Sequence, residues 1–257
     1  MTTKDSLQPK EKSTSISNSS NKNKGESKMN THRKTAIMVG VFYIAATVAG
    51  MLSLPFTEPT LNAPDYLINV SANQNQVLIG ALFVLVMAVA VAGIAITVYP
   101  VLRKHNESIA IGYVGARIVE GVIDIISVVN LLALVKLSQE FVKAGSPDAS
   151  SFQTLGESLR VVQGWGVHVV LDVAVFPLGA LIFNYLLYQS KLVPRWLSGW
   201  GLIGAPLWWA AGLLVMFGHD PFSTIPVLLN LPIGVQEMVL AVWLIVKGFN
   251  SSATEAV

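Results

Sequence analysis

Six long stretches of apolar residues, separated by short polar segments, follow a polar N-terminal region. They are Ala36–Phe56, Val77–Leu102, Ile109–Val135, Val161–Tyr188, Leu197–Phe217 and Ile225–Val246. Each exceeds the ~20 residues with which a helix crosses ~30 Å of hydrocarbon. Backbone groups in lipid need partners within the segment, so these stretches predict helices, and the sequence lacks the ~10-residue alternating strands of a membrane barrel. The pattern predicts an all-α, polytopic bundle of six transmembrane helices.

The N-terminal region differs in composition from everything after it. Residues 1–33 are rich in Ser, Asn and Lys, and such a segment buries too little apolar surface to offset the entropy of ordering. We expect a disordered, basic, cytoplasmic tail over 1–33, a transmembrane domain over 34–250 and a short C-terminal tail over 251–257. The long polar region favours an uncleaved first span over a signal peptide.

Composition and charge agree with this organisation. The chain is 53% hydrophobic and only 12% charged, about half the charge of a soluble domain, which excludes an ordinary soluble enzyme. Residues 1–34 hold eight Lys/Arg and three Asp/Glu, a net of +5, so the rest carries −3 of the overall +2. The basic character belongs to the tail, and the expected partner is the lipid bilayer, with no nucleic acid. The absence of cysteine excludes thiolate chemistry.

The distribution of Lys and Arg predicts the orientation in the membrane. The tail and the connections after the second, fourth and sixth stretches hold thirteen Lys/Arg on one side. The opposite side holds three, Lys136, Lys143 and Arg160. The positive-inside rule then gives a multi-pass protein of the cell membrane with both termini in the cytoplasm. The tryptophans at 196, 200, 208 and 209 are typical of membrane-interface anchors.

Ionisable residues inside the spans form the candidate site. They are Arg117, Glu120, Asp124, His168, Asp172 and Glu237. Helical spacing puts the three residues of the third stretch on one stripe, which Tyr113 shares, and it puts His168 and Asp172 on one face of the fourth. In the sixth stretch Asn230 and Glu237 share a face. The rise per residue places the polar residues of the third, fourth and sixth stretches at similar depths in the membrane, so we predict that they can meet.

The charges of this cluster do not balance. Intramembrane charges cost at least ~2.5–3.5 kcal/mol each and normally pair inside the bundle. One arginine faces four carboxylates, so the surplus must be protonated, be hydrated or hold a cation. A purely structural role, with Arg117–Glu120 locking helices together, explains that pair equally well. One histidine without HExxH spacing is a weak metal signal, and we predict no bound metal and no cofactor.

Three separated motifs carry a family resemblance. Arg117-Ile-Val-Glu120, Ser190-Lys-Leu-Val-Pro-Arg-Trp-Leu197, and Glu237-Met-Val-Leu-Ala-Val-Trp243 with Lys247-Gly248-Phe249 resemble the bacterial membrane family called domain of unknown function 4386. The resemblance covers roughly residues 34–250. It implies a small polytopic bacterial membrane protein, adds weight to Arg117, Glu120 and Glu237, and supplies no catalytic residues.

Three functional classes remain for an uncharacterised multi-pass membrane protein. The buried cluster could serve a small transporter or a proton- or cation-coupled protein, whose small-molecule or ion ligand the sequence does not identify. Six spans without a visible inverted repeat make a small transporter, which would need a homodimer. An intramembrane enzyme using the Glu, Asp and His groups ranks last, because no Ser/His/Asp or metalloprotease spacing is present. In the third class the buried charges only fix packing.

Overall fold

The chain folds into long helices. The computed structural model describes the backbone of residues 11–144 and 149–255 and the side chains of residues 31–144 and 150–254. Helices and turns, without a strand, make up these residues. The elements are α1 (Glu11–Leu61), α2 (Tyr66–Ala72), α3 (Gln74–Leu102), α4 (Glu107–Ala144), α5 (Ala149–Val161), η2 (Val162–Val167), η3 (Val170–Val175), α6 (Phe176–Ser190), α7 (Arg195–Met216), α8 (Thr224–Val246) and α9 (Ser251–Glu255).

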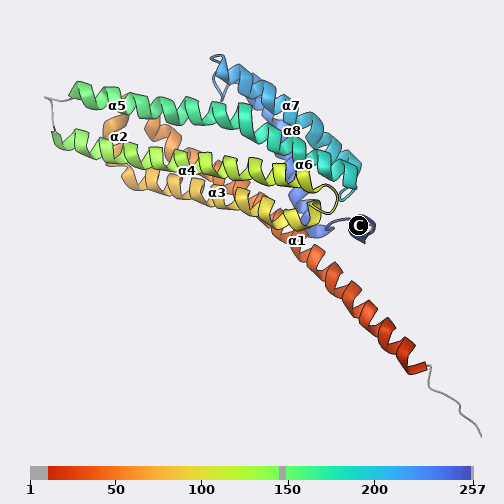
Figure 1. Ribbon diagram of the computed structural model, residues 1–257. Coiled ribbons are helices and arrows are strands. Elements are labelled where there is room, and N and C mark those ends of the chain that lie inside the picture. Colours follow the sequence, from red (N-terminus) through yellow and green to blue (C-terminus); the bar gives the residue numbers. More distant parts are fainter. Residues whose placement is uncertain (1–10, 145–148, 256–257) are drawn as a thin grey trace, which may run out of the picture.

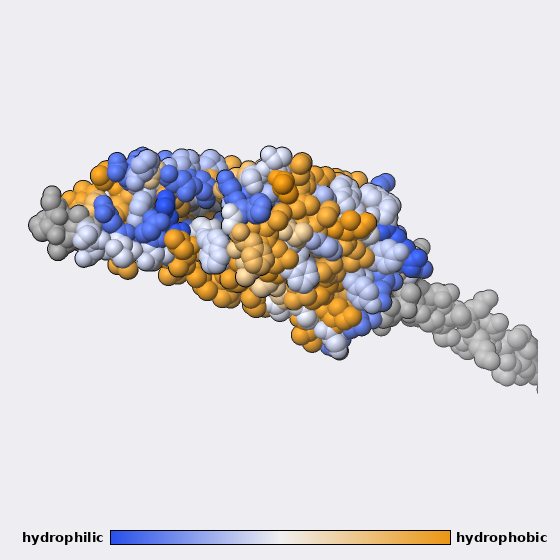
Figure 2. Space-filling model, turned by 90° about the horizontal axis from the view of Figure 1, so that it is seen from above, coloured by the Kyte–Doolittle hydropathy of each residue, from blue (hydrophilic) through white to orange (hydrophobic). Residues whose placement is uncertain are grey.

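Six helical stretches of the described chain are long and apolar enough to cross a membrane. They are Thr31–Leu61, Gln74–Leu102, Glu107–Ala144, Ser150–Ser190, Arg195–Met216 and Thr224–Val246. The predicted all-α, six-span architecture is therefore confirmed, and the protein is a multi-pass membrane protein. On the face shown in Figure 2, hydrophobic side chains dominate the middle of the molecule, and hydrophilic ones gather toward its ends.

The six spans form a closed ring. Each packs against the next along the chain, in the order α1, α3, α4, α6, α7 and α8, and α8 packs back against α1. The closing contact is tight, since a Cβ added to Gly40 on α1 would lie 2.6 Å from the carbonyl oxygen of Ala241 on α8. Small residues allow such backbone contacts between membrane helices. The ring makes one interior that all six spans share.

Arg33 reinforces the closure of the ring at the end where the C-terminus lies. Its guanidinium donates to the carbonyl oxygens of Leu244, Ile245 and Val246 at 3.1, 2.7 and 3.2 Å. These are the last carbonyls of α8, which lack partners within their own helix, and a cation there also complements the helix dipole. Arg33 thereby joins the first span to the last.

The N-terminal part of α1 extends away from this ring (Figure 1). The helix begins at Glu11 and so includes much of the segment for which the sequence predicts disorder. Residues 1–10 lie outside the described residues. An isolated helix of polar composition is marginal in water, and disorder of residues 1–33 in solution stays a prediction.

The opposite end of the molecule is a distal lobe made of α2, α5 and the adjoining ends of α1, α3 and α4 (Figure 1). At 38 residues, α4 is about 57 Å long, so it extends well past ~30 Å of hydrocarbon. A distal core of eleven buried residues runs through the lobe from Leu61 to Val135. Tyr66 also donates to the carbonyl oxygen of Gln153 at 3.3 Å, joining α2 to α5. The segment between the first two apolar stretches, which the sequence predicts only as a polar connection, contains the end of α1 and all of α2.

A second, proximal core fills the end of the ring near the C-terminus. It contains twenty buried residues contributed by the helices of the ring and by the connections beside them. Aromatic rings stack where this core faces the middle of the bundle, with centroids 4.6 Å apart for Tyr113 and Phe183 and 6.1 Å apart for Tyr43 and Phe183. The candidate site lies just beyond this stack.

Candidate functional site

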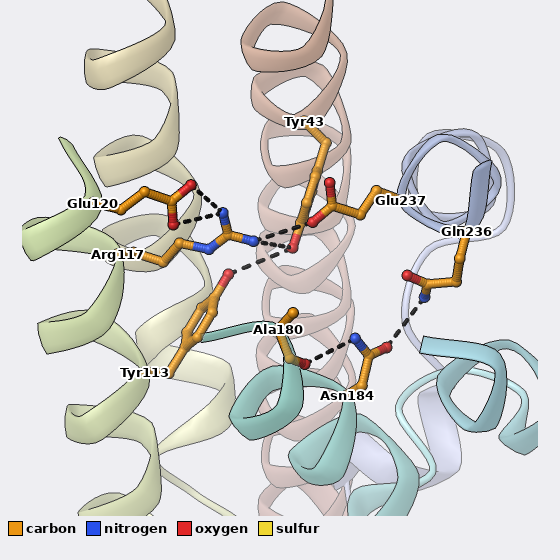
Figure 3. Close-up of polar contacts among 8 residues, drawn as sticks. All are labelled: Tyr43, Tyr113, Arg117, Glu120, Ala180, Asn184, Gln236 and Glu237. Carbon is orange, nitrogen blue, oxygen red and sulfur yellow. Dashed lines mark hydrogen bonds and ion pairs between the residues drawn. The ribbon is translucent and has the colours of Figure 1, made fainter. Parts of the chain in front are cut away.

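Arg117 lies at the centre of the site and joins its own span, α4, to α1 and α8. Its Nη1 donates to both carboxylate oxygens of Glu120, at 3.0 and 3.1 Å. Its Nη2 donates to Oε1 of Glu237 at 3.2 Å and to the hydroxyl of Tyr43 at 3.3 Å. Figure 3 shows the guanidinium reaching from α4 between the two glutamates, toward α1 and α8. One arginine therefore neutralises carboxylates of the third and sixth spans at once.

Aromatic rings make the burial of this arginine tolerable. The side chain of Arg117 is only 3% exposed, and its guanidinium carbon lies 5.7 Å from the ring centroids of Tyr43 and Tyr113 and 5.6 Å from that of Phe176. The negative faces of such rings attract a desolvated cation. Nε of Arg117 is buried without a partner in the described structure, so the arrangement is held mainly by the two Nη groups.

His168 and Asp172 lie in an irregular part of the fourth span. Two π-helical segments, η2 and η3, flank His168, and Asp172 belongs to the second. Pro177 follows at the start of α6; a proline removes a backbone donor and crowds the preceding turn, and the wider π-turns lie just ahead of it. Such π-turns are frequent at functional sites. Here they place both side chains toward the ring interior.

Trp208 of α7 holds Asp172. Its indole Nε1 donates to Oδ1 of Asp172 at 3.0 Å. Gly212, one turn along α7, lets the helices approach, because a Cβ added there would lie 2.8 Å from the carbonyl oxygen of Asp172. The sequence favours an interface-anchor role for Trp208; the structure corrects this, since the ring faces inward to a carboxylate.

Asp124 differs from the other carboxylates in having no partner for a buried oxygen. The residue is 2% exposed, and Oδ2 makes no hydrogen bond within the described structure. It lies one turn beyond Glu120 on the same face of α4, which is the side that faces the ring interior. Burying a polar group without a hydrogen bond is unfavourable, so this oxygen is an available acceptor.

All six ionisable residues singled out in the sequence line one cavity of about 270 Å³. The structure thus brings Arg117, Glu120 and Asp124 of α4 together with His168 and Asp172 of the fourth span and with Glu237 of α8. The remaining walls are mainly aromatic and aliphatic side chains, including Phe176, Trp208 and Ile94, and Thr47 and Ser53 of α1 add hydroxyl groups. Asn230, expected on the same face as Glu237, is not among the lining residues.

Leu54 lies between this cavity and a second one toward the distal end of the bundle. It also lines the second cavity, of about 330 Å³, together with Pro55, Glu58, Pro59, Asn62 and Phe222. That second cavity lies between the end of α1 and the connection from α7 to α8. Toward the other end the stacked rings of Tyr113 and Phe183 and the proximal core close off the site. The two ends of the site therefore differ, since a second cavity adjoins one end and packed side chains fill the other.

A neutral polar cluster lies beside the charged one. Gln236 of α8 is fully buried and donates from Nε2 to Oδ1 of Asn184 at 3.1 Å and to the carbonyl oxygen of Leu197 at 3.2 Å. Asn184 in turn donates to the carbonyl oxygen of Ala180 at 2.9 Å (Figure 3). A Cβ at Gly201 would collide with the amide of Asn184. None of these residues lines the cavity.

Sequence reasoning missed two members of the site. Tyr43 lies in the first stretch without a charged neighbour, so nothing in its spacing indicates that it accepts a hydrogen bond from Arg117. Trp208 was indistinguishable from the other tryptophans around it. Their place in the site becomes apparent only in the folded ring. There α1 packs beside the residues of α4, and α7 packs beside those of η3.

The cavity lining was compared with the requirements of a metal site, and the chain with known protein families. Within the described residues no group of three or more His, Cys, Asp or Glu side chains is arranged to hold a metal ion. Residues 38–248 match the family described as domain of unknown function (DUF4386). No curated protein and no solved structure matches the chain.

Proposed function

The chain belongs to the family called domain of unknown function 4386, and we propose that its six-helix ring takes up a proton or a small cation in the central cavity, as a small transporter or cation-coupled membrane protein. The observation that carries the proposal is the excess of carboxylates around one buried cavity. Four carboxylates face one guanidinium there, and Oδ2 of Asp124 is buried without a partner.

The charge arrangement supports cation uptake more than a packing role alone. A set of charges that only locked helices would be balanced, because an uncompensated buried charge is costly. Arg117 is already shared between Glu120 and Glu237 at 3.0 and 3.2 Å. Asp172 accepts a hydrogen bond from the neutral indole of Trp208, and the nearby ionisable group is His168, one turn away. A positive charge in the cavity would restore the balance that these side chains lack.

The difference between the two ends of the site also supports a transport-like role. Leu54 lies between the central cavity and the cavity at the distal end, whereas the proximal core closes the other end. A site reached from one side at a time is what alternating access requires. We place the distal end outside the cell and both termini in the cytoplasm, because Lys and Arg are concentrated at the proximal end.

Thermal unfolding of the purified full-length protein tests this proposal. Ligands that bind only the folded state stabilise it by an amount that grows with their concentration. We expect the wild-type melting temperature to respond to pH or to added cations, and Asp124→Asn to lose that response. Asp65→Asn is the matched control, since Asp65 is exposed and lies outside the cavity. Responses that coincide for wild type and Asp124→Asn would contradict the proposal.

A further inference from the structure

Asp124 offers a ligand in the cavity a hydrogen-bond acceptor. Its Oδ2 is the one buried carboxylate oxygen without a partner in the described structure. Each neighbouring carboxylate already accepts at least one hydrogen bond, since Arg117 donates to Glu120 and Glu237 and Trp208 donates to Asp172. A ligand that brings an N–H donor to Asp124 gains a charge-assisted hydrogen bond that no protein group supplies there.

The surroundings of Asp124 disfavour an inorganic cation. Calcium takes six to eight oxygen ligands and magnesium near-octahedral coordination, and no suitable group of three acidic or His side chains occurs in the described chain. The cation that suits this site therefore needs few oxygen ligands.

The other walls suit a hydrocarbon body. Met87, Val91 and Ile94 of α3 contribute aliphatic surface to the lining of the cavity. Trp208 and Phe176, whose ring centroids are 4.6 Å apart, add aromatic faces of the kind that bind ammonium groups. At about 270 Å³, the space is near the lower end of the ~300–1,000 Å³ typical of ligand pockets. The ligand it fits is small.

We propose that the cavity binds a small organic ammonium ion, with its N–H groups donating to Asp124 and its apolar body against the α3 and aromatic walls. This rests on the proposed function and names the class of its cation. The ammonium supplies both the positive charge and the donor that the carboxylate cluster lacks. Its hydrocarbon part needs no polar partner, which accounts for the mixed lining of the cavity.

Benzylammonium chloride is the test ligand, because it combines one ammonium group with a small apolar body. We expect it to raise the melting temperature of the detergent-purified full-length protein in a saturable way. Benzyl alcohol and sodium chloride at equal concentration should not, since one lacks the charge and the other the apolar body. Asp124→Asn should weaken the apparent affinity about ten- to hundredfold, the range expected when one hydrogen bond to a charged group is lost.

Two further variants keep the result interpretable. Asp65→Asn should bind as the wild type does. Ala46→Leu adds volume at a lining residue without changing any charge, and it should also weaken binding, which covers the case in which Asp124→Asn fails to fold. Stabilisation by sodium or by pH alone, lost in Asp124→Asn, would overturn the ammonium assignment and leave the proposed function standing. No response to any cation or to pH would overturn both.

Discussion

Gln236 and Glu237 are neighbours on α8, yet they belong to two buried clusters of different kinds. Gln236 joins a neutral set with Asn184 and the carbonyl oxygen of Leu197, and the atom it leaves unpartnered is a neutral amide oxygen. Glu237 joins a charged set around Arg117 that borders a cavity and contains an excess of carboxylates. Both clusters contain buried polar groups. Only the charged cluster has a surplus of carboxylates beside a cavity, and this marks it as the candidate site.

The difference has a physical basis in how each cluster is satisfied. Neutral amides need only direct hydrogen bonds, and α6 and α7 supply acceptors for the amide group of Gln236 on α8. Ionised groups need compensating charge as well, and their mutual attraction rarely repays their desolvation. A bundle selected only for stability gains little from four carboxylates around an interior cavity, two of them, Glu120 and Asp124, buried. The charged cluster is therefore the part of the interior that packing explains least.

Removal of Arg117 should break the charged cluster most severely. Arg117→Leu leaves Glu120 and Glu237 without their shared counter-charge, and breaking one side of a buried ion pair typically costs about 3–5 kcal/mol. Unfolding in mixed detergent micelles measures this loss. Arg117→Leu combined with Glu120→Gln and Glu237→Gln should recover much of it. The sequence alone suggests that changing Glu120 suffices, but the structure ties Arg117 to both glutamates. A triple variant no more stable than Arg117→Leu would refute the shared pairing.

Changes in the neutral cluster should have intermediate effects. Gln236→Leu removes the donor to Asn184 and Leu197 and leaves buried acceptors unpaired, which costs about 1–3 kcal/mol. The double change Gln236→Leu with Asn184→Leu should restore much of the stability, because replacing both partners by apolar groups is nearly neutral. The same unfolding titration applies. If the melting temperatures of both variants still respond to cations, the neutral cluster has a packing role. If they no longer respond, this cluster belongs to the cation site.

Glu237→Gln should have the smallest effect on stability. Glutamine retains an oxygen that can accept the hydrogen bond from Arg117 at 3.2 Å, so we expect a loss of about 1 kcal/mol. Cation uptake is the more informative readout for this variant. A melting temperature that responds to pH and cations as the wild type does would assign Glu237 to neutralising Arg117, with Asp124 left as the ligand-facing carboxylate. A reduced response would place Glu237 in the site itself.

The membrane spans and the polar residues inside them were within reach of sequence reasoning. Lipid leaves so few options for backbone hydrogen bonding that stretches such as 77–102 can only be helices. Helical spacing also indicates which faces of the third and fourth spans are polar. The lengths of the helices were not predictable in the same way, since α4 continues to Ala144 and α5 begins at Ala149 in polar segments whose helicity depends on packing in the distal lobe.

By itself the sequence determined the helical class, six spans, a surplus of carboxylates and the side chains that carry it, because hydropathy and charge are properties of local composition. Only the tertiary structure decided that the last span closes on the first, that Arg117 bridges Glu120 and Glu237, and that Trp208 turns inward to Asp172. These depend on which helices are neighbours and how they are rotated. Membrane helices are apolar on nearly every side, so hydrophobic periodicity cannot show which helices are neighbours or how each is rotated. Close packing at residues such as Gly40 and Gly212 decides both.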